Sequence, residues 1–186
     1  ESSDPLDGAS LVDNRFVLKY MHDVKHVVKI YALDGTFEKD VRLPGLGTVG
    51  GFGGHQDDTE SYFTFTSYLN PSEIYHYDFR TGKAELFRQP EIQFNFDDYT
   101  TEQVFFTSKD GTRVPMFLIH RKDLVLDGTN PTILYGYGGF NISLQPGFSI
   151  TLLPWLEKGG VYAVANLRGG GEYGEEWHQG GMLKNK

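Results

Sequence analysis

Short runs of alternating apolar and polar residues fill the first half of the chain, and turn-forming residues separate them. Residues 14–45 follow the order strand, turn, strand, Asp-Gly turn, strand, and residues 60–91 repeat that order. The dipeptide Ile-Tyr at 30–31 recurs about 44 residues later, at 74–75. A strand-only repeat of about 40–50 residues is typical of β-propeller blades. The alternative is an antiparallel meander that does not close. Two copies cannot close a propeller, so closure would need blades outside this segment.

The pattern changes near residue 91. A hairpin with an Asp-Gly turn is followed by an apolar strand, a helix or helical turn ended by two glycines, a continuous apolar run and the start of a further helix. The two hairpin strands are Val104–Thr107 and Val114–His120, and the apolar strand is Thr132–Leu134. The first helical segment is 147–160, the continuous apolar run is Val161–Leu167, and the last helix starts within 174–181. Strand, loop, helix and strand in this order indicate an α/β sheet. We therefore predict two domains, residues 1–92 and 93–186.

Composition removes several function classes. The net charge is −8 with no basic stripe, which argues against nucleic-acid binding. There are no cysteines, so disulfides, thiolate nucleophiles and cysteine metal sites are absent, as suits a reducing compartment. The first residues do not resemble a signal peptide, and no apolar run approaches the roughly 18 residues of a membrane span. We expect a cytoplasmic protein that does not bind membranes, and we interpret the chain as a segment of a longer one.

Residues 45–50, GLGTVG, match the dinucleotide-binding pattern G-x-G-x-x-G. That motif needs a following helix whose N-terminus points at a pyrophosphate. More glycines and then acidic residues follow instead, without a helical pattern. We interpret the segment as a glycine-rich linker between blades, and we expect no cofactor.

The hexapeptide YGYGGF, residues 135–140, follows the apolar strand Thr132–Leu134. In α/β-hydrolases a glycine-rich loop after an early strand supplies half of the oxyanion hole. Glycines allow close approach of the backbone to a substrate. A glycine turn flanked by core aromatic residues explains the position equally well, so both readings stay open at this point.

The segment 166–178, NLRGGGEYGEEWH, follows the second apolar strand, and sites in α/β sheets gather at such strand ends. Arg168 could pair with a carboxylate of its own loop and order it; the candidates are Glu172, Glu175 and Glu176. His178 near Glu175 suggests a metal ligand, but no second ligand has suitable spacing. We favour a structural role for His178 and predict no metal site.

A serine nucleophile is not evident, because no G-x-S-x-G occurs in the sequence. Ser143 and Ser149 do not stand in a strand-to-helix elbow. In α/β-hydrolases the acid and the histidine follow the serine. The segment could therefore hold an oxyanion donor without a nucleophile, acid or base.

The motifs YGYGGF and RGGGEYGxxWHxGG together resemble the prolyl oligopeptidase family of serine peptidases, and the likeness covers the whole chain. It implies the last blades of a β-propeller, residues 1–92, followed by the first part of an α/β-hydrolase domain, residues 93–186. It further implies cleavage of short peptides after proline through an acyl-enzyme, by a monomer whose catalytic triad lies elsewhere in the same protein.

The resemblance also implies roles for three residues. Tyr137 matches the tyrosine whose hydroxyl donates to the oxyanion, and Phe140 matches an aromatic residue of the proline pocket. Arg168 matches an arginine to which we assign only the ordering of its loop. Two alternatives remain. One is an inactive propeller and hydrolase-like binding module, and the other is a related dipeptidyl-peptidase or esterase.

Overall fold

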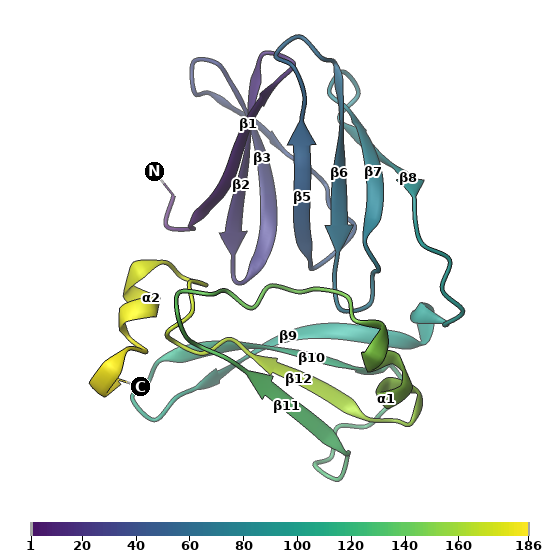
Figure 1. The fold of residues 1–186 in the computed structure, drawn as a ribbon, viewed down its shortest axis with the longest axis vertical. Coiled ribbons are helices and arrows are strands. Elements are labelled where there is room, and N and C mark those ends of the chain that lie inside the picture. Colours follow the sequence, from purple (N-terminus) through teal and green to yellow (C-terminus); the bar gives the residue numbers. More distant parts are fainter. Residues whose placement is uncertain (1, 186) are drawn as a thin grey trace. The chain divides into compact units, whose positions relative to one another are not determined.

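The computed structural model describes residues 2–185, and the chain divides into two compact units (Figure 1). The first unit contains the residues up to Glu91 together with Gln145–Gly147. The second contains Ile92–Leu144 and the residues from Phe148 onward. Two sheets belong to the first unit and one sheet belongs to the second.

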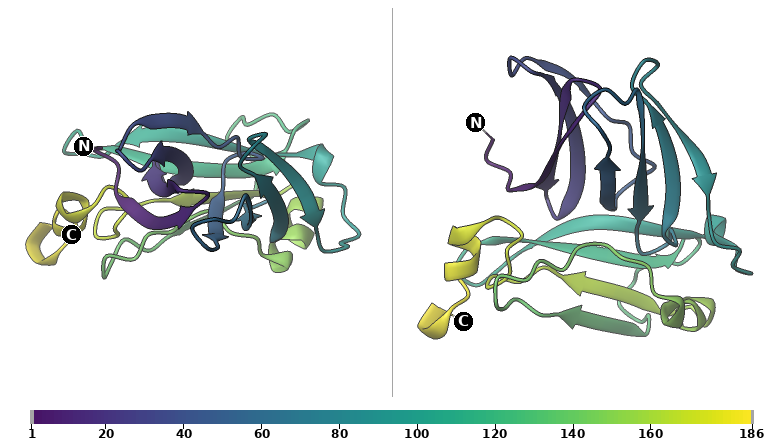
Figure 2. Two further views of the ribbon diagram at one scale, coloured as in Figure 1. Left: turned by 90° about the horizontal axis from the view of Figure 1, so that it is seen from above. Right: turned by 45° about the horizontal axis from the view of Figure 1, so that its top comes forward.

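The first unit is built from two four-stranded antiparallel sheets, with strand orders β1-β2-β3-β4 and β5-β6-β7-β8 (Figures 1 and 2). The strands are β1 Leu6–Val12, β2 Arg15–His22, β3 Lys25–Ala32, β4 Phe37–Asp40, β5 Thr48–Gly53, β6 Glu60–Thr66, β7 Glu73–Asp78 and β8 Lys83–Arg88. Ile30 lies in β3 and Ile74 in β7, the third strand of each sheet. The sequence repeat therefore corresponds to one blade-like sheet per copy.

Each sheet has one strand more than the repeat predicts, and the additional strand is the first. The linker interpretation of GLGTVG is wrong beyond Gly47, because β5 begins at Thr48. Glycines replace the β-branched residues that usually reveal a strand. The pairing of β5 with β6 shifts register between Gly51 and Gly53, and Gly51 has φ +98°. Such a bulge needs glycine, and it hides the strand from a reading of alternation.

Aromatic side chains fill the core of the first unit. Along β6 buried and exposed residues alternate, which places Phe63 and Phe65 inside. The ring of Phe63 stacks on Phe52 with centroids 4.6 Å apart. Aromatic pairs of this kind contribute about 0.5–1.5 kcal/mol beyond the area they bury. The buried cluster comprises Val12, Val17, Val28, Ile30, Val41, Val49, Phe52, Phe63, Phe65, Tyr77 and Phe79.

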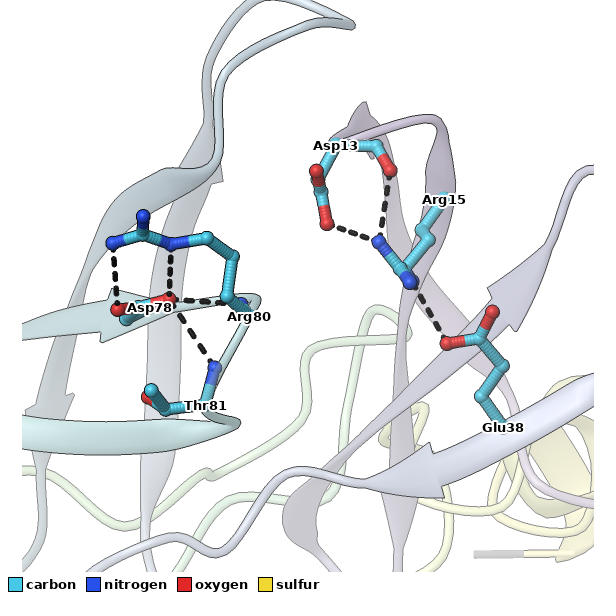
Figure 3. Close-up of polar contacts among 6 residues, drawn as sticks. All are labelled: Asp13, Arg15, Glu38, Asp78, Arg80 and Thr81. Atoms are coloured by element: carbon cyan, nitrogen blue, oxygen red, sulfur yellow. Dashed lines mark hydrogen bonds and ion pairs between the residues drawn. The ribbon is translucent and has the colours of Figure 1, made fainter.

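Charged residues near the turns of the two sheets are paired locally (Figure 3). Arg15 donates to the Glu38 carboxylate at 2.8 Å and also contacts the carboxylate of Asp13. Arg80 lies against Asp78, with Nη2 and Oδ2 3.3 Å apart. Exposed pairs of this kind contribute at most about 1 kcal/mol each. These pairs therefore contribute little to the stability of the unit.

The second unit contains one mixed sheet with strand order β11-β12-β10-β9. Its strands are β9 Tyr99–Thr107, β10 Arg113–Arg121, β11 Thr132–Gly136 and β12 Val161–Ala165. The predicted hairpin is confirmed as the antiparallel pair β9 and β10, although β9 begins five residues earlier than expected. β11 and β12 are parallel, and β12 is largely buried, as its continuous apolar run predicts.

A short helical crossover joins the two parallel strands. The 3₁₀ turn η2, Ile150–Leu152, leads into α1, Leu153–Glu157. Gly159 has φ +79°, its N–H donates to Leu156, and the N–H of Gly160 donates to Trp155. This is a Schellman C-cap, so the predicted glycine stop is confirmed. The remaining helical elements are η1 Phe96–Asp98, α2 Glu175–Gln179 and η3 Leu183–Asn185.

Candidate active site

The two candidate loops begin at the same edge of the second unit's sheet. Gly136, the last residue of β11, pairs in parallel with Ala165, the last residue of β12. Tyr137 and Asn166 therefore leave the sheet side by side. The carboxyl ends of parallel strands are where α/β proteins place their ligands. The structure thus brings the YGYGGF loop and the RGGG loop together.

The three glycines after Arg168 allow the two loops to touch through their backbones. A Cβ on Gly169 would lie 2.3 Å from the carbonyl oxygen of Gly138, and Gly169 has φ +103°. A Cβ on Gly171 would lie 2.9 Å from the carbonyl oxygen of Asn141. Asn141 also donates its N–H to the Gly169 carbonyl at 3.0 Å. The glycine run is therefore a packing requirement of the YGYGGF loop.

Tyr137 and Phe140 present their rings to solvent, with exposed fractions of 43% and 84%. Their ring centroids are 6.5 Å apart and the ring planes are 28° from parallel. Phe140 and the next residue, Asn141, have φ values of +54° and +57°. A side-chain-bearing residue pays roughly 1–2 kcal/mol for that conformation. Strain held next to two exposed aromatic rings is typical of a functional site.

A phenol hydroxyl and an exposed aromatic face offer distinct chemistry at this edge. The Tyr137 hydroxyl can donate one hydrogen bond to a developing negative charge. The Phe140 ring can pack against a flat apolar group such as a pyrrolidine ring. Neither side chain belongs to the serine, carboxylate and histidine set that carries out acyl transfer in a catalytic triad.

We refer to the YGYGGF loop and the segment after it, up to Leu144, as the first loop, and to residues 166–178 as the second loop. Arg168 lies in the second loop and pairs with the β9–β10 turn. Its Nη2 is 2.6 Å from Asp110 Oδ2. The prediction that named Glu172, Glu175 or Glu176 as the partner missed Asp110, which is remote in sequence but adjacent in the sheet. Hydrogen bonds from Thr112, and then the Arg168 guanidinium, lower the pKa of Asp110 to about 2. Arg168 thus connects its loop to a hairpin turn.

His178 supports the same loop from α2. Its Nδ1 lies 2.7 Å from the Gly169 carbonyl oxygen, so this nitrogen must carry the proton and donate. The N–H of Gly169 in turn donates to Trp177 at 3.0 Å. These contacts give His178 a structural place in the loop. No group of three or more His, Asp or Glu residues suited to a metal ion occurs within residues 2–185.

The backbone at Ser143 and at Ser149 does not form a strand-to-helix elbow, as the sequence predicts for these two serines. Ser143 and Ser149 lie in irregular segments, and Ser149 precedes the 3₁₀ turn η2 with extended φ and ψ. The Ser149 hydroxyl contacts the Thr151 hydroxyl at 2.8 Å.

Among the helices of the described region, none is long and apolar enough to cross a membrane.

Two polar residues around the glycine run are buried, which the sequence did not predict: Glu172 was named only as a possible partner of Arg168, and Asn166 was not singled out. Asn166 and Glu172 are both 0% exposed. The Leu144 N–H donates to Glu172 Oε1 at 3.0 Å, and Asn166 Nδ2 donates to the Leu144 carbonyl at 2.8 Å. The one available signal was position, because both residues flank the glycine run that the loop packing requires.

Family models match both units of the chain. The model described as the N-terminal β-propeller domain of prolyl oligopeptidase matches residues 1–90. The model of the prolyl oligopeptidase family, which describes the peptidase domain, matches residues 146–186. The fold is therefore a set of β-propeller blades followed by the first part of an α/β-hydrolase domain, as predicted.

Relatives with curated names agree with these models. A prolyl endopeptidase of Elizabethkingia miricola is 48% identical over 171 residues, which is 92% of this chain and 24% of that protein. A prolyl endopeptidase of Elizabethkingia meningoseptica is 46% identical over 100% of this chain and 26% of that protein. The chain belongs to the prolyl oligopeptidase family. It spans about a quarter of the length of these relatives.

Solved structures of the family show the same fold. One, from a structural and mechanistic analysis of two prolyl endopeptidases, has a TM-score of 0.91 and 47% identity. The match covers 100% of this chain and 27% of that structure's chain. Prolyl oligopeptidase B from Galerina marginata, bound to a 25mer macrocyclization substrate, has a TM-score of 0.91 and 34% identity. The coverage there is 100% of this chain and 26% of that structure.

Proposed function

We propose that the full-length protein carrying this chain is a serine-type endopeptidase that cleaves short peptides on the carboxyl side of proline. The observation that carries the proposal is the exposed pair Tyr137 and Phe140 at the carboxyl end of β11, in a chain 48% identical to a prolyl endopeptidase. No other function class has a comparable observation in its favour.

In this proposal the segment supplies the oxyanion side of the site. A serine elsewhere in the protein attacks the carbonyl that follows the proline ring, and the carbonyl oxygen becomes an oxyanion. The Tyr137 hydroxyl donates to that oxygen as charge develops, so it stabilises the transition state more than the substrate. Collapse of the tetrahedral intermediate releases the amine and leaves an acyl-enzyme, which water then hydrolyses.

Phe140 would select the residue that precedes the cleaved bond. Its ring is 84% exposed, so an apolar ligand ring can reach one of its faces. Proline offers a compact apolar ring without a backbone N–H, and stacking against an aromatic face suits that shape. Arg168 would order the loop that abuts Tyr137, through its pair with Asp110 at 2.6 Å.

We also propose the remaining features of the protein. The domain boundary lies between residues 92 and 93, and the nucleophile, acid and histidine lie in other parts of the same protein. The enzyme acts as a monomer in the cytoplasm, without a cofactor. The lack of cysteine supports a reducing compartment, and the much greater length of the relatives supports a triad outside this segment.

The test is hydrolysis of a blocked Gly-Pro chromogenic amide by the full-length protein. Tyr137→Phe should lower kcat by about 10- to 1,000-fold with a smaller change in KM, as expected for one lost oxyanion donor. Tyr135→Phe is the matched control, because it removes a hydroxyl two residues earlier, in β11, and should leave kcat unchanged. A folded wild-type protein that does not cleave the amide contradicts the proposal, and an unchanged kcat in Tyr137→Phe removes the assigned role.

A further inference from the structure

A fully buried carboxyl group lies behind the two candidate loops. Glu172 is 0% exposed, and its Oε1 accepts the Leu144 N–H at 3.0 Å. The Leu144 carbonyl accepts from Asn166 Nδ2 at 2.8 Å, and Asn166 is 0% exposed as well. The side chains of Glu172 and Asn166 therefore hold both the N–H and the carbonyl group of Leu144.

Leu144 ends the segment that begins at Tyr137. Within that segment, the Gly138 carbonyl abuts Gly169, and Asn141 donates to the Gly169 carbonyl at 3.0 Å. Glu172 supplies the anchor at the far end. A segment anchored at its middle and at its end has few ways to move its first residue. We propose that Glu172 is a positioning residue that fixes the Tyr137 loop in the geometry the oxyanion requires.

The shape of the second loop accommodates this carboxyl group. A Cβ on Gly170 would lie 2.1 Å from Glu172 Oε2 and 2.7 Å from the Ile142 carbonyl oxygen. Glycine at 170 thus leaves the space into which the carboxyl group folds, against the backbone of the first loop. A larger residue at 170 would displace either the carboxyl group or Ile142.

The burial of Glu172 costs folding free energy, which argues for a role other than stability. Its Oε2 has no hydrogen-bond partner within residues 2–185, and neither does Asn166 Oδ1. Apolar residues of similar shape can replace a buried hydrogen-bonded polar pair with little loss of stability. A costly buried group that touches the loop of a site is therefore better explained by the geometry it imposes.

This inference rests on the proposed function, and a double-mutant cycle in the full-length protein tests it. The variants are Tyr137→Phe, Glu172→Ala and their combination, assayed with the blocked Gly-Pro chromogenic amide. Glu172→Ala should lower kcat by about 10- to 100-fold and change KM by less than about 3-fold, as a misplaced donor does. If Glu172 acts through Tyr137, the double variant should be no more than about 3-fold slower than Tyr137→Phe. Fully multiplicative losses overturn the proposal.

Conservative replacement and a matched control separate positioning from general damage. Glu172→Gln keeps an oxygen that can accept the Leu144 N–H, so kcat should return to within about 3-fold of wild type. A Gln variant as slow as the Ala variant contradicts the proposed contact. Glu73 is the control, because it is a 7% exposed carboxylate held by Tyr75 and Asn70 in the other unit. Glu73→Ala should lower stability and leave kcat unchanged.

Hydrogen exchange distinguishes failure of this inference from failure of the proposed function. If the wild-type protein does not cleave the amide, the peptidase proposal falls, and exchange of the backbone amides of residues 137–144 decides the role of Glu172. The hydrogen-bonded amides of Asn141, Ile142 and Leu144 should exchange at least about 10-fold faster in Glu172→Ala, and at near wild-type rates in Glu172→Gln. Unchanged exchange in the Ala variant shows that Glu172 does not hold the loop.

Discussion

Gly169→Ala tests the close packing of the two loops most directly. Gly169 has φ +103°, and a Cβ there would lie 2.3 Å from the Gly138 carbonyl oxygen and 3.2 Å from that of Gly181. Both neighbours are backbone atoms, so they cannot rotate away as a flexible side chain would. The alanine must either push the first loop outward or change its own backbone conformation.

Two costs add at this position. A side chain in the left-handed region costs roughly 1–2 kcal/mol. Overpacking of a tight contact costs about 1–3 kcal/mol more. We expect Gly169→Ala to lower the free energy of unfolding by about 2–5 kcal/mol. Gly111→Ala is the matched control, because Gly111 has φ +85° with no atom within 4 Å of the added Cβ. It should show the first cost alone.

The free energy of unfolding of both variants is measured by urea denaturation of the full-length protein. The unfolding transition of the peptidase domain is the one that is monitored. The difference between Gly169→Ala and Gly111→Ala isolates the steric part of the effect. Because the displaced loop carries Tyr137, kcat on the proline amide should also fall in Gly169→Ala and stay unchanged in Gly111→Ala. Equal destabilisation by the two alanines would refute the inferred contact between the loops.

Two further predictions concern Phe140 and Asp110. Phe140→Ala should raise KM for a proline amide by about 10-fold with a smaller change in kcat, since one aromatic contact contributes about 1–2 kcal/mol of binding; kinetics equal to wild type would remove Phe140 from the proline pocket. The pKa of Asp110 is about 2, below the ordinary value near 3.9, so its stabilising contribution is complete above about pH 4 and is lost as pH falls toward 2. Wild type should therefore lose more stability than Asp110→Asn between about pH 5 and pH 2.5 in urea titrations, and parallel curves would contradict the assigned hydrogen bonds.

The blades could be predicted from sequence where side chains alternate. Buried residues stand at every second position in β6, and in its counterpart copy the same holds for His26, Val28 and Ile30 of β3. The first strand of each sheet could not be found in this way. β5 places three glycines in six residues, and its register shift breaks the period of two on which the prediction depends. A bulge is a feature of pairing, and single-strand alternation does not report it.

The meeting of the two candidate loops could be predicted, but the contacts between them could not. Parallel strands bring their carboxyl ends to one edge, so a strand-end loop has a predictable neighbour. The partner of Arg168 follows from a different relation. Asp110 belongs to the β9–β10 turn, and only the antiparallel pairing of β10 with β12 brings that turn near the end of β12. Carboxylates near Arg168 in sequence therefore do not include Asp110.

The three glutamates after the glycine run show why burial was harder to predict than proximity. Glu175 and Glu176 are exposed in α2, as carboxylates usually are, whereas Glu172 is fully buried. The difference follows from the glycines themselves. Three residues without side chains let the backbone of the first loop come close, which brings the Leu144 N–H within reach of an acceptor on the second loop. The first side chain after the run is the nearest that can supply one. A carboxylate that directly follows a glycine run at the end of a buried strand is therefore a candidate for an inward, loop-holding role, even where composition predicts exposure.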